Sequence, residues 1–497
     1  MFRAAELGAS VAKDEFRQRE PVLRHELLEV QRDLSIHGRY PVIVVFAGVD
    51  GAGKGQTINL LNAWMDPRWI KTRAYKDASD EERERPPYWR FWRDLPPRGQ
   101  FGLFLSSWYS CPILDRVNGA IDVPLFTRCL DRIVTFENML AEDGAVILKF
   151  WMHLSKSAQK RRLKMLEKDP LTRWRVIERD WKHWGMYDQF IDAAERTITR
   201  TGSVRAPWYI VEGEDFNHRS LTVGGIIRDA VRARLDVDRA RSAEAVDQGA
   251  APVVVAAPPK RLLSSLDMSK ALDKDAYQLQ LKQQQARLSL LCREALAKQV
   301  STIVVLEGPD AAGKGGNIRR VTAALDARNY QVLPFAAPTD EERAHHYLWR
   351  FWRHLSRAGR LTIYDRSWYG RVLVERVEGL ASPEQWRRAY AEINAFEEEL
   401  VEHGIVLVKY WLHITKDEQL VRFREREQVP YKRWKLTDED WRNREKWDDY
   451  EIAVHDMVEN TSTRETPWIL VEGNDKRYAR VRVLTTLCER LESKLKK

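Results

Sequence analysis

The chain has 497 residues, of which 44% are hydrophobic and 31% are charged, a composition typical of two or three folded domains and not of a disordered polyelectrolyte. Its 82 basic and 73 acidic residues leave a formal net charge of +9, which favours anionic partners but is too balanced for a basic tail or a general nucleic-acid coat. The four cysteines show no CxxC spacing, so neither a zinc site nor a disulfide framework is indicated.

The N-terminal segment has no apolar leader, and no stretch of the chain approaches the roughly 18 apolar residues that a membrane span needs. Together with unpaired cysteines, these features predict a cytoplasmic protein with no membrane and no nucleic-acid partner. The sequence leaves homo-oligomer formation open.

The sequence contains one unit written twice. "AGVDGAGKG" from Ala47 matches "EGPDAAGKG" from Glu307, "YWRFWR" matches "LWRFWR", and "APWYIVEGED" matches "TPWILVEGND". All three pairs are offset by 260 residues, the separation of Lys54 and Lys314, so the copies align over most of their length without a gap. A duplication of this size predicts two tandem domains of one fold.

Between the copies, the segment from Ser242 to Ser265 is rich in Ala, Pro and Val and has no amphipathic period. Such a composition is typical of a partly extended linker. We therefore divide the chain into an N-terminal domain at 1–238, a linker at 239–272 and a C-terminal domain at 273–497.

Within the second unit, strands and helices are predicted to alternate. The first strand, Thr302–Leu306, is a short β-branched run suited to a buried parallel strand, and a glycine loop and a helix follow it. Further strands are predicted to end at Asp365 and to begin at Ile405 and at Trp468, with a helix over Pro383–Gly404. This alternation predicts an α/β fold, a parallel sheet flanked by helices, with ligands at the carboxyl ends of the strands.

The stretch "GPDAAGKG" has the G-x-x-x-x-G-K pattern of a phosphate-binding loop and lies where such a loop belongs, after a strand and at the start of a helix. Backbone N–H groups would point at phosphate oxygens, and Lys314 would add a positive charge. The alternative is a plain glycine turn with a surface lysine. The other predicted phosphate-binding positions of the loop are Gly308, Ala312, Gly313 and Gly315.

The residue after Lys314 is Gly315 and not Ser or Thr, so the hydroxyl that usually binds magnesium in such a loop is absent. Asp310 inside the loop and Asp365 at a strand end are predicted to converge at the carboxyl edge of the sheet, as hard oxygen ligands of Mg²⁺. The alternative for Asp365 is a turn or helix-capping role.

Two arginines, Arg366 and Arg371, flank the Ser-Trp-Tyr-Gly sequence that follows the strand ending at Asp365. Guanidinium groups suit bidentate contact with phosphate oxygens. Two loop arginines are by themselves more often solvated, but their place just after this strand favours phosphate binding.

A third basic cluster lies in "RFREREQVPYKRWK", from Arg422 to Lys435. At this point of a kinase-like fold, a basic segment is expected to be a lid that closes over a long anion and excludes water. A charged helical face is an equal alternative for its first part, where acidic and basic residues alternate. The later residues Lys432, Arg433 and Lys435 lack such balance and are predicted to bind phosphate.

These motifs together resemble the polyphosphate kinase 2 family. The resemblance is carried by "EGPDAAGKGG", "YDRSWYGR", "RWKLTDEDWRNREKWDDY" and "PWILVEGNDKRYAR", and it spans nearly the whole chain outside the linker and the N-terminal tail. It implies two tandem thymidylate-kinase-like P-loop domains, each with a helical lid. As in the tandem members of the family, it also implies inorganic polyphosphate as donor, AMP as acceptor and Mg²⁺ as cofactor.

The family's catalytic roles fall on residues of the second unit, namely Asp310, Lys314, Asp365 and Arg366. The first unit keeps the loop residues Asp50 and Lys54. It departs elsewhere, since Leu105, Ser106 and Cys111 stand opposite Asp365, Arg366 and Arg371, and Phe216 and Asn217 stand opposite Lys476 and Arg477. These differences predict a catalytic C-terminal domain and a degenerate N-terminal domain.

The predicted activity is Mg²⁺-dependent transfer of the terminal phosphoryl group of polyphosphate to AMP, which gives ADP. An ATP-dependent nucleoside monophosphate kinase would use the same loop, lid and acidic pair, and stays an alternative. A non-catalytic polyanion-binding protein is a second alternative. The two carboxylates argue against it, because they repel a polyanion unless a cation lies between them.

Overall fold

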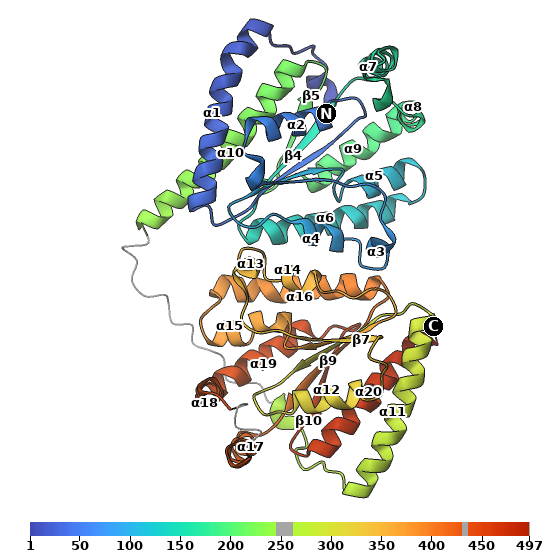
Figure 1. Cartoon of the computed structure of the whole chain (residues 1–497), viewed down its shortest axis with the longest axis vertical. Coiled ribbons are helices and arrows are strands. Elements are labelled where there is room, and N and C mark those ends of the chain that lie inside the picture. The colour runs from blue at the N-terminus through green and yellow to red at the C-terminus, as the bar shows by residue number, and fades with distance from the viewer. Residues whose placement is uncertain (245–261, 430–435, 497) are drawn as a thin grey trace. The chain divides into compact units, whose positions relative to one another are not determined.

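The computed structural model describes residues 1–244, 262–429 and 436–496 of the chain. The chain divides into two compact units, and each holds one five-stranded parallel sheet with helices on both faces (Figure 1). The predicted α/β class and the tandem duplication are confirmed. The N-terminal half has the strand order β2-β3-β1-β4-β5, and the C-terminal half repeats it as β7-β8-β6-β9-β10.

The elements of the N-terminal half begin with a short 3-10 helix and a long α-helix before the first strand. Its strands are β1 (Val42–Gly48), β2 (Ile70–Ala74), β3 (Phe101–Leu105), β4 (Val146–His153) and β5 (Trp208–Glu212). Its helices are η1 (Phe2–Ala5), α1 (Lys13–His37), α2 (Lys54–Trp64), η2 (Pro67–Trp69), α3 (Asp80–Arg83), α4 (Trp89–Asp94), α5 (Ser110–Val117), α6 (Val123–Glu142), α7 (Lys156–Lys168), η3 (Arg173–Arg175), α8 (Glu178–Gly185), α9 (Tyr187–Thr201) and α10 (Phe216–Glu244).

The C-terminal half follows the same plan. Its strands are β6 (Thr302–Glu307), β7 (Tyr330–Pro334), β8 (Leu361–Asp365), β9 (Val406–His413) and β10 (Trp468–Glu472). Its helices are η4 (Leu263–Ser265), α11 (Lys274–Ala297), α12 (Lys314–Thr322), α13 (Asp340–Arg343), α14 (Trp349–Trp352), η5 (Trp368–Arg371), α15 (Val374–Val377), α16 (Pro383–Glu402), α17 (Lys416–Gln428), α18 (Asp438–Glu445), α19 (Trp447–Thr461) and α20 (Lys476–Leu495).

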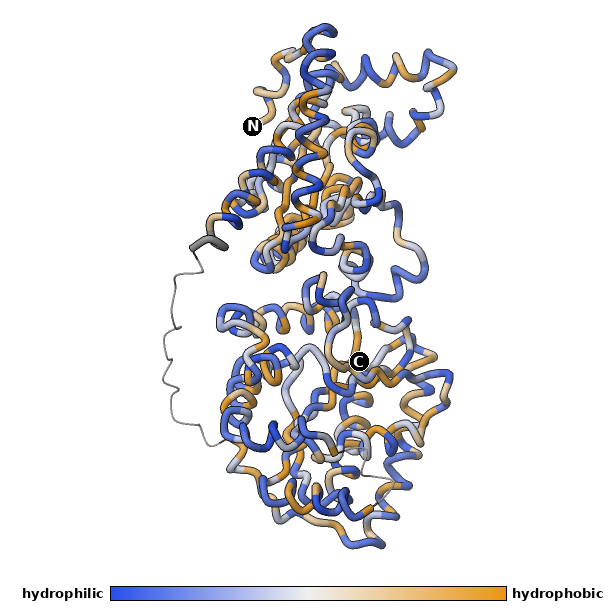
Figure 2. The backbone as a smooth tube through the Cα atoms, turned by 60° about the vertical axis from the view of Figure 1, so that its left-hand side comes forward, coloured by the Kyte–Doolittle hydropathy of each residue, from blue (hydrophilic) through white to orange (hydrophobic). Residues whose placement is uncertain are grey.

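The central strands are apolar because both faces of each sheet are covered. All six residues of β6 are buried, and helix pairs such as α11 with α20 and α16 with α19 pack around the sheet. Figure 2 shows the same pattern as hydrophobic stretches inside each unit and hydrophilic stretches along the outer helices. Continuous apolar strands of this kind are typical of parallel sheets. Among the described helices, none is both long and apolar enough to span a membrane.

The predicted domain boundaries stay a prediction. Helix α10 continues past residue 238 as far as Glu244, and η4 lies inside the predicted linker at 239–272. Residues 245–261, the central part of that linker, lie outside the described residues. The η4 helix occupies nearly the same place in the repeat as η1, so the second copy begins before residue 273.

The Ser-Trp-Tyr sequence shared by both copies ties the turn after β8 to a buried ion pair. Lys409 on β9 and Glu397 on α16 are 2.7 Å apart, and their side chains are 0% and 1% exposed. The Trp368 indole and the Tyr369 hydroxyl both donate to Oε1 of Glu397, at 3.0 and 2.6 Å. Burial lowers the pKa of Lys409, and the adjacent Glu397 carboxylate opposes this change.

The first unit repeats this network with its own residues. Lys149 and Glu137 are 2.6 Å apart, and the Trp108 indole and the Tyr109 hydroxyl donate to the same carboxylate at 3.0 and 2.6 Å. Because both copies keep the network, the Ser-Trp-Tyr sequence belongs to the scaffold. The residues around it are free to differ between the units.

Replacing Lys409 by Met leaves the Glu397 carboxylate buried without its counter-charge. We expect the free energy of unfolding to fall by about 3–5 kcal/mol, the usual cost of removing one partner of a buried ion pair. Lys496→Met, which removes an exposed pair with Glu492, is the control and should change little. Urea denaturation followed by circular dichroism measures both variants, and an equally small loss in both would contradict the role given to the buried pair.

Candidate functional site

The loop between β6 and α12 has the geometry of a phosphate-binding loop. Gly308, Ala311 and Gly313 have φ values of 152°, 64° and 106°, which turn the chain from the strand into the helix that begins at Lys314. A Cβ added at Gly308 would lie 2.5 Å from the carbonyl oxygen of Leu412, so the backbone contact there requires glycine. This is the strand, loop and helix arrangement that the sequence predicts.

The Lys314 side chain folds back over the loop. Its Nζ donates to the carbonyl oxygens of Gly308 and Pro309, at 2.5 and 3.4 Å. The ammonium group therefore lies near the N-terminus of α12, and this combination of a positive charge and free backbone N–H groups attracts phosphate. The other predicted loop positions are Gly313, which is the N-cap residue of α12, Gly315, its second residue, and Ala312, which is buried.

Arg422, the first residue of the predicted basic lid cluster, instead holds this loop in place. It lies on α17 and its side chain is 3% exposed. Its guanidinium donates to the carbonyl oxygens of Ala311 and Ala312 at 2.9 and 3.2 Å, and to those of Gly473 and Asn474 at 2.6 and 2.9 Å. Arg422 therefore fixes the phosphate loop to the end of β10 and has a structural role.

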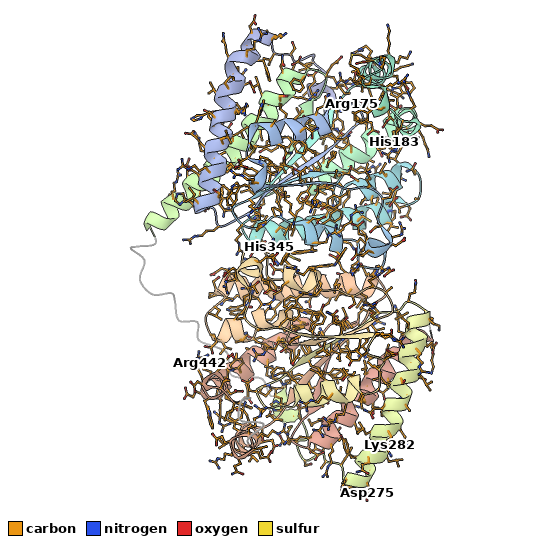
Figure 3. The ribbon with its side chains drawn as sticks, in the orientation of Figure 1. Arg175, His183, Asp275, Lys282, His345 and Arg442 are labelled. Atoms are coloured by element: carbon orange, nitrogen blue, oxygen red, sulfur yellow. The ribbon has the colours of Figure 1, made fainter. Side chains whose placement is uncertain are left out.

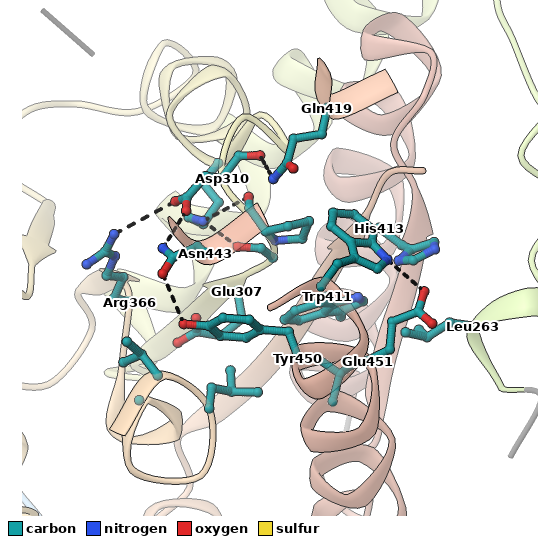
Figure 4. A pocket seen from close by; sticks show the side chains of 18 of the residues that line it. Leu263, Glu307, Asp310, Arg366, Trp411, His413, Gln419, Asn443, Tyr450 and Glu451 are labelled. Carbon is teal, nitrogen blue, oxygen red and sulfur yellow. Dashed lines mark hydrogen bonds and ion pairs between the residues drawn. The ribbon is translucent and has the colours of Figure 1, made fainter. Parts of the chain in front are cut away.

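Asp310 lies in the loop with its carboxylate turned toward α18 (Figure 4). Its Oδ2 accepts a hydrogen bond from the Asn443 amide at 2.8 Å, and its Oδ1 is 3.9 Å from the Arg366 guanidinium. The Asp310 carbonyl oxygen accepts from Gln419 at 3.0 Å, which fixes the backbone. A neutral amide and a distant guanidinium leave most of the negative charge of Asp310 available to a cation.

Arg366 follows β8 directly and has a left-handed backbone with a φ of 65°. Ser106, its counterpart in the first unit, has a φ of 55°. Non-glycine residues rarely adopt this conformation, and it carries strain. Because both copies adopt it, the turn is a property of the scaffold, and the difference between the units lies in the side chain.

Glu307 is a residue of this site that the sequence analysis did not single out. It ends β6, is 5% exposed and accepts a hydrogen bond from the Ser367 hydroxyl at 2.8 Å. Burial raises the pKa of its carboxyl, and the nearby charge of Asp365 adds to the rise against the opposing cations. The first unit has Ala47 at this position, a difference that was visible in the aligned loop sequences.

These groups face a pocket with an aromatic wall, shown in Figure 4. Trp411 from β9 and Trp447 and Tyr450 from α19 line it, together with Leu263 from η4. His413 also lines the pocket, and burial lowers its pKa to about 4, so it is neutral at pH 7. Trp411 and Trp447, although 5% and 8% exposed, therefore contribute to the wall of this pocket as well as to the core.

Two predicted residues lie near this pocket without being part of its lining. Asp365 is the last residue of β8 and pairs with Leu306 in the sheet, and its charge acts on Glu307. Arg371 forms an ion pair with Glu375 at 2.9 Å and does not line the pocket. The structure thus brings Asp310, Lys314 and Arg366 together, with Asp365 close by. The predicted lid residues Lys432, Arg433 and Lys435 lie outside the described residues.

The first unit keeps the loop but surrounds it differently. Gly53 has a φ of 88° before α2, and Lys54 donates to the Gly48 and Val49 carbonyl oxygens at 2.6 and 2.8 Å. The Asp50 carboxylate lies 2.7 Å from a ring nitrogen of His183, the residue at the position of Asn443. The backbone of the site and its loop aspartate and lysine are therefore shared, whereas the charged side chains of Glu307, Asp365 and Arg366 are not.

A phosphate loop between the first strand and its following helix, in a five-stranded parallel sheet, defines a P-loop kinase-like protein, here present in two copies. The model of the polyphosphate kinase 2 family matches residues 10–239 and 271–497. The chain belongs to the polyphosphate kinase 2 family, as its motifs predict.

Individual relatives share the full two-unit length. The chain is 52% identical over 498 residues to a polyphosphate:AMP phosphotransferase of Pseudomonas aeruginosa, with 100% of both chains covered. It is 35% identical to a protein of the same description from Acinetobacter johnsonii, with 91% of both covered. A crystal structure from Pseudomonas aeruginosa, described as a putative polyphosphate kinase 2, matches all of both chains with a TM-score of 0.90 and 50% identity.

Replacing Arg422 by Lys tests how the loop is held. A lysine ammonium cannot donate to the four carbonyl oxygens that the Arg422 guanidinium contacts. We therefore expect the free energy of unfolding to fall by about 2–3 kcal/mol, which is the contribution of one or two charged hydrogen bonds. Arg424→Lys, on an exposed position of the same helix, is the matched control. Thermal denaturation of both variants measures the difference, and equal midpoints would show that Arg422 does not hold the loop.

Proposed function

We propose that this chain transfers the terminal phosphoryl group of inorganic polyphosphate to AMP, which gives ADP, and that the second unit carries the activity. The observation behind the proposal is the pocket in which Lys314, Asp310 and Arg366 lie opposite an aromatic wall. Full-length relatives that bear the name polyphosphate:AMP phosphotransferase support the choice of donor and acceptor.

The main demand of this reaction is to bring two anions together. The acceptor oxygen belongs to a phosphate whose second pKa is near ~6, so it is mostly ionised at neutral pH and needs no strong general base. Lys314 and Arg366 would offset the repulsion between donor and acceptor oxygens and hold them in line. Arg371 is paired with Glu375 in the structure, so a contact with phosphate would require it to exchange that partner.

Mg²⁺ is the cofactor that we propose for the second unit. In the described part of the chain, no three His, Cys, Asp or Glu side chains are grouped as a metal site. Mg²⁺ does not need three such ligands from the protein, because it is usually held by one or two carboxylates and completes its coordination shell with water and phosphate oxygens. Asp310 and Asp365 are the carboxylates that would hold it, and the ion would supply positive charge to the phosphate oxygens.

The aromatic wall is suited to the flat base of the nucleotide. Trp411, Trp447 and Tyr450 offer apolar ring surfaces, and Val374 adds an aliphatic side chain to the same pocket. The Trp447 indole is held by Glu451 at 3.1 Å, which fixes its orientation. In this proposal the base rests on the wall while the phosphate of AMP points toward the loop.

The two other candidate functions differ from this proposal in their substrates. The pocket chemistry alone suits an ATP-dependent nucleoside monophosphate kinase equally well. A polyanion-binding protein without catalysis would need no cation, whereas the carboxylates of Glu307, Asp310 and Asp365 disfavour an anion that arrives without one. Homo-oligomer formation and the absence of a nucleic-acid partner stay predictions.

The purified full-length protein, incubated with AMP, Mg²⁺ and ATP-free polyphosphate, should form ADP, and EDTA should abolish the product. Chromatographic separation of the nucleotides measures the reaction. ADP formed from ATP but not from polyphosphate would identify the ATP-dependent kinase. Polyphosphate binding that needs no Mg²⁺ and gives no ADP would identify the non-catalytic protein.

The two loop aspartates provide a matched test of which unit is catalytic. We expect Asp310→Asn and Asp365→Asn each to lower kcat by about 10²–10³-fold, the usual effect of removing a group that stabilises transition-state charge. Asp50→Asn should leave kcat within about threefold, because the position of Asp365 is occupied by Leu105 in that unit. Steady-state kinetics with polyphosphate and AMP distinguish these cases, and an equal loss from Asp50→Asn would contradict the assignment.

A further inference from the structure

The first unit contains a cavity of about 520 Å³ at the position of the second unit's pocket. It lies at the carboxyl edge of the first sheet, between the phosphate loop, the turn after β3 and helix α8. Figure 3 labels His183 on α8, which lines this cavity. The charged side chains that line the cavity are Asp50, Lys54, Lys76, Asp77, Arg90 and Arg179.

The charge of this cavity differs from that of the second pocket at corresponding positions. Glu307, which lines the second pocket, and Asp365 beside it are replaced by Ala47 and Leu105, which removes two carboxylates, and the lining residue Arg366 is replaced by Ser106, which removes one cation. Glu439, which lines the second pocket, corresponds to Arg179, which lines the first. The same backbone therefore holds an acidic site in one unit and a basic site in the other.

The remaining loop carboxylate of the first unit is already in contact with protein groups. Asp50 Oδ2 lies 2.7 Å from Nδ1 of His183, and its Oδ1 lies 3.8 Å from Nζ of Lys54. Burial raises the pKa of Asp50, but His183, Lys54 and Arg179 outweigh burial and lower it, so the carboxylate is ionised and Nδ1 must be the donor. Asp310 in the second unit accepts a hydrogen bond from the neutral Asn443 amide and lies 3.9 Å from the Arg366 guanidinium.

Other features of the cavity suit an anion. Burial lowers the pKa of Lys54, so a bound anion would stabilise its charged form. Trp151 lines the cavity and is 2% exposed, and its indole N–H has no hydrogen-bond partner among the residues that the structure describes. A lysine at a helix N-terminus and an arginine in the same lining form an arrangement that binds phosphate oxygens, and Trp151 belongs to that lining.

We propose that the cavity of the first unit binds a phosphate chain, inorganic or nucleoside-borne, without a divalent cation and without turning it over. The cations that a phosphate chain requires are supplied here by Lys54 and Arg179. The positions of Asp365 and Arg366 hold Leu105 and Ser106, so the site lacks the groups assigned to transfer. This inference does not depend on the activity of the second unit.

A native cysteine reports on this site alone. Cys111 lines the first cavity and is exposed, and the second unit has Arg371 at the same position. In the full-length protein with EDTA, inorganic tripolyphosphate should slow alkylation of Cys111 by iodoacetamide about tenfold at ten times its Kd, as simple occupancy requires. Cys129, on α6 and outside the cavity lining, should react at an unchanged rate. Peptide mass spectrometry measures both rates.

Matched variants show which unit is responsible for the protection of Cys111. Arg179→Glu, which installs the charge of the second unit at this position, should abolish the protection of Cys111, and Lys54→Met should weaken it. Lys314→Met, the same change in the second unit, should leave it intact. Protection that requires Mg²⁺, that survives Arg179→Glu, or that disappears with Lys314→Met would overturn the proposal, as would no protection at all.

Comparing two added ligands shows whether the site binds an inorganic or a nucleoside-borne phosphate chain. Protection by tripolyphosphate but not by ADP assigns the site to an inorganic chain. Protection by ADP in EDTA, with tripolyphosphate weaker, assigns it to a nucleoside-borne chain that uses the aromatic surfaces of Trp151 and Phe190. Because the experiment contains no acceptor and no Mg²⁺, its result is separate from whether the second unit phosphorylates AMP.

Discussion

The buried ion pair between Lys409 and Glu397 is the interaction on which the carboxyl edge of the second sheet depends. It joins β9 to α16, and through Trp368 and Tyr369 it also fixes the turn that follows β8. Burying two charges has a large desolvation cost, so the pair contributes to a unique arrangement more than to net stability. That arrangement sets the strained backbone of Arg366 and its distance from Asp310.

The same network in the first unit explains how a duplicated site can lose its charges and keep its fold. The pair of Lys149 and Glu137 fixes the turn after β3, so the left-handed backbone persists although Ser106 replaces an arginine. The side chains of Arg366 and Ser106 are not buried, so they contribute little to core packing. Their replacement therefore changes the chemistry of the edge without a matching loss of stability.

Much of the scaffold could be predicted from the sequence, since strands, loop and helices follow from local patterns and the duplication repeats each pattern. The site was harder to predict where a side chain contacts an element far from it in the sequence. Arg422 sits in a run of alternating charges that suggests a solvated helix, and only the tertiary structure brings it to the loop carbonyls. Asn443 gives no local signal of its contact with Asp310, and Arg371, adjacent to the motif, is paired with Glu375.

In the function proposed for the second unit, the comparison of the two loops links the proposed metal to catalysis. A phosphate site with carboxylates repels its ligand until a cation is bound, and that cation then also stabilises the charge of the transferred group. In the proposed site of the first unit, Ala47 and Leu105 stand in place of Glu307 and Asp365, and Arg179 in place of Glu439, which removes the repulsion and with it the need for the proposed metal. The same replacements remove the groups that favour the transition state over the bound state. A site of this kind gains affinity for phosphate by the changes that cost it turnover, because uniform binding does not accelerate a reaction.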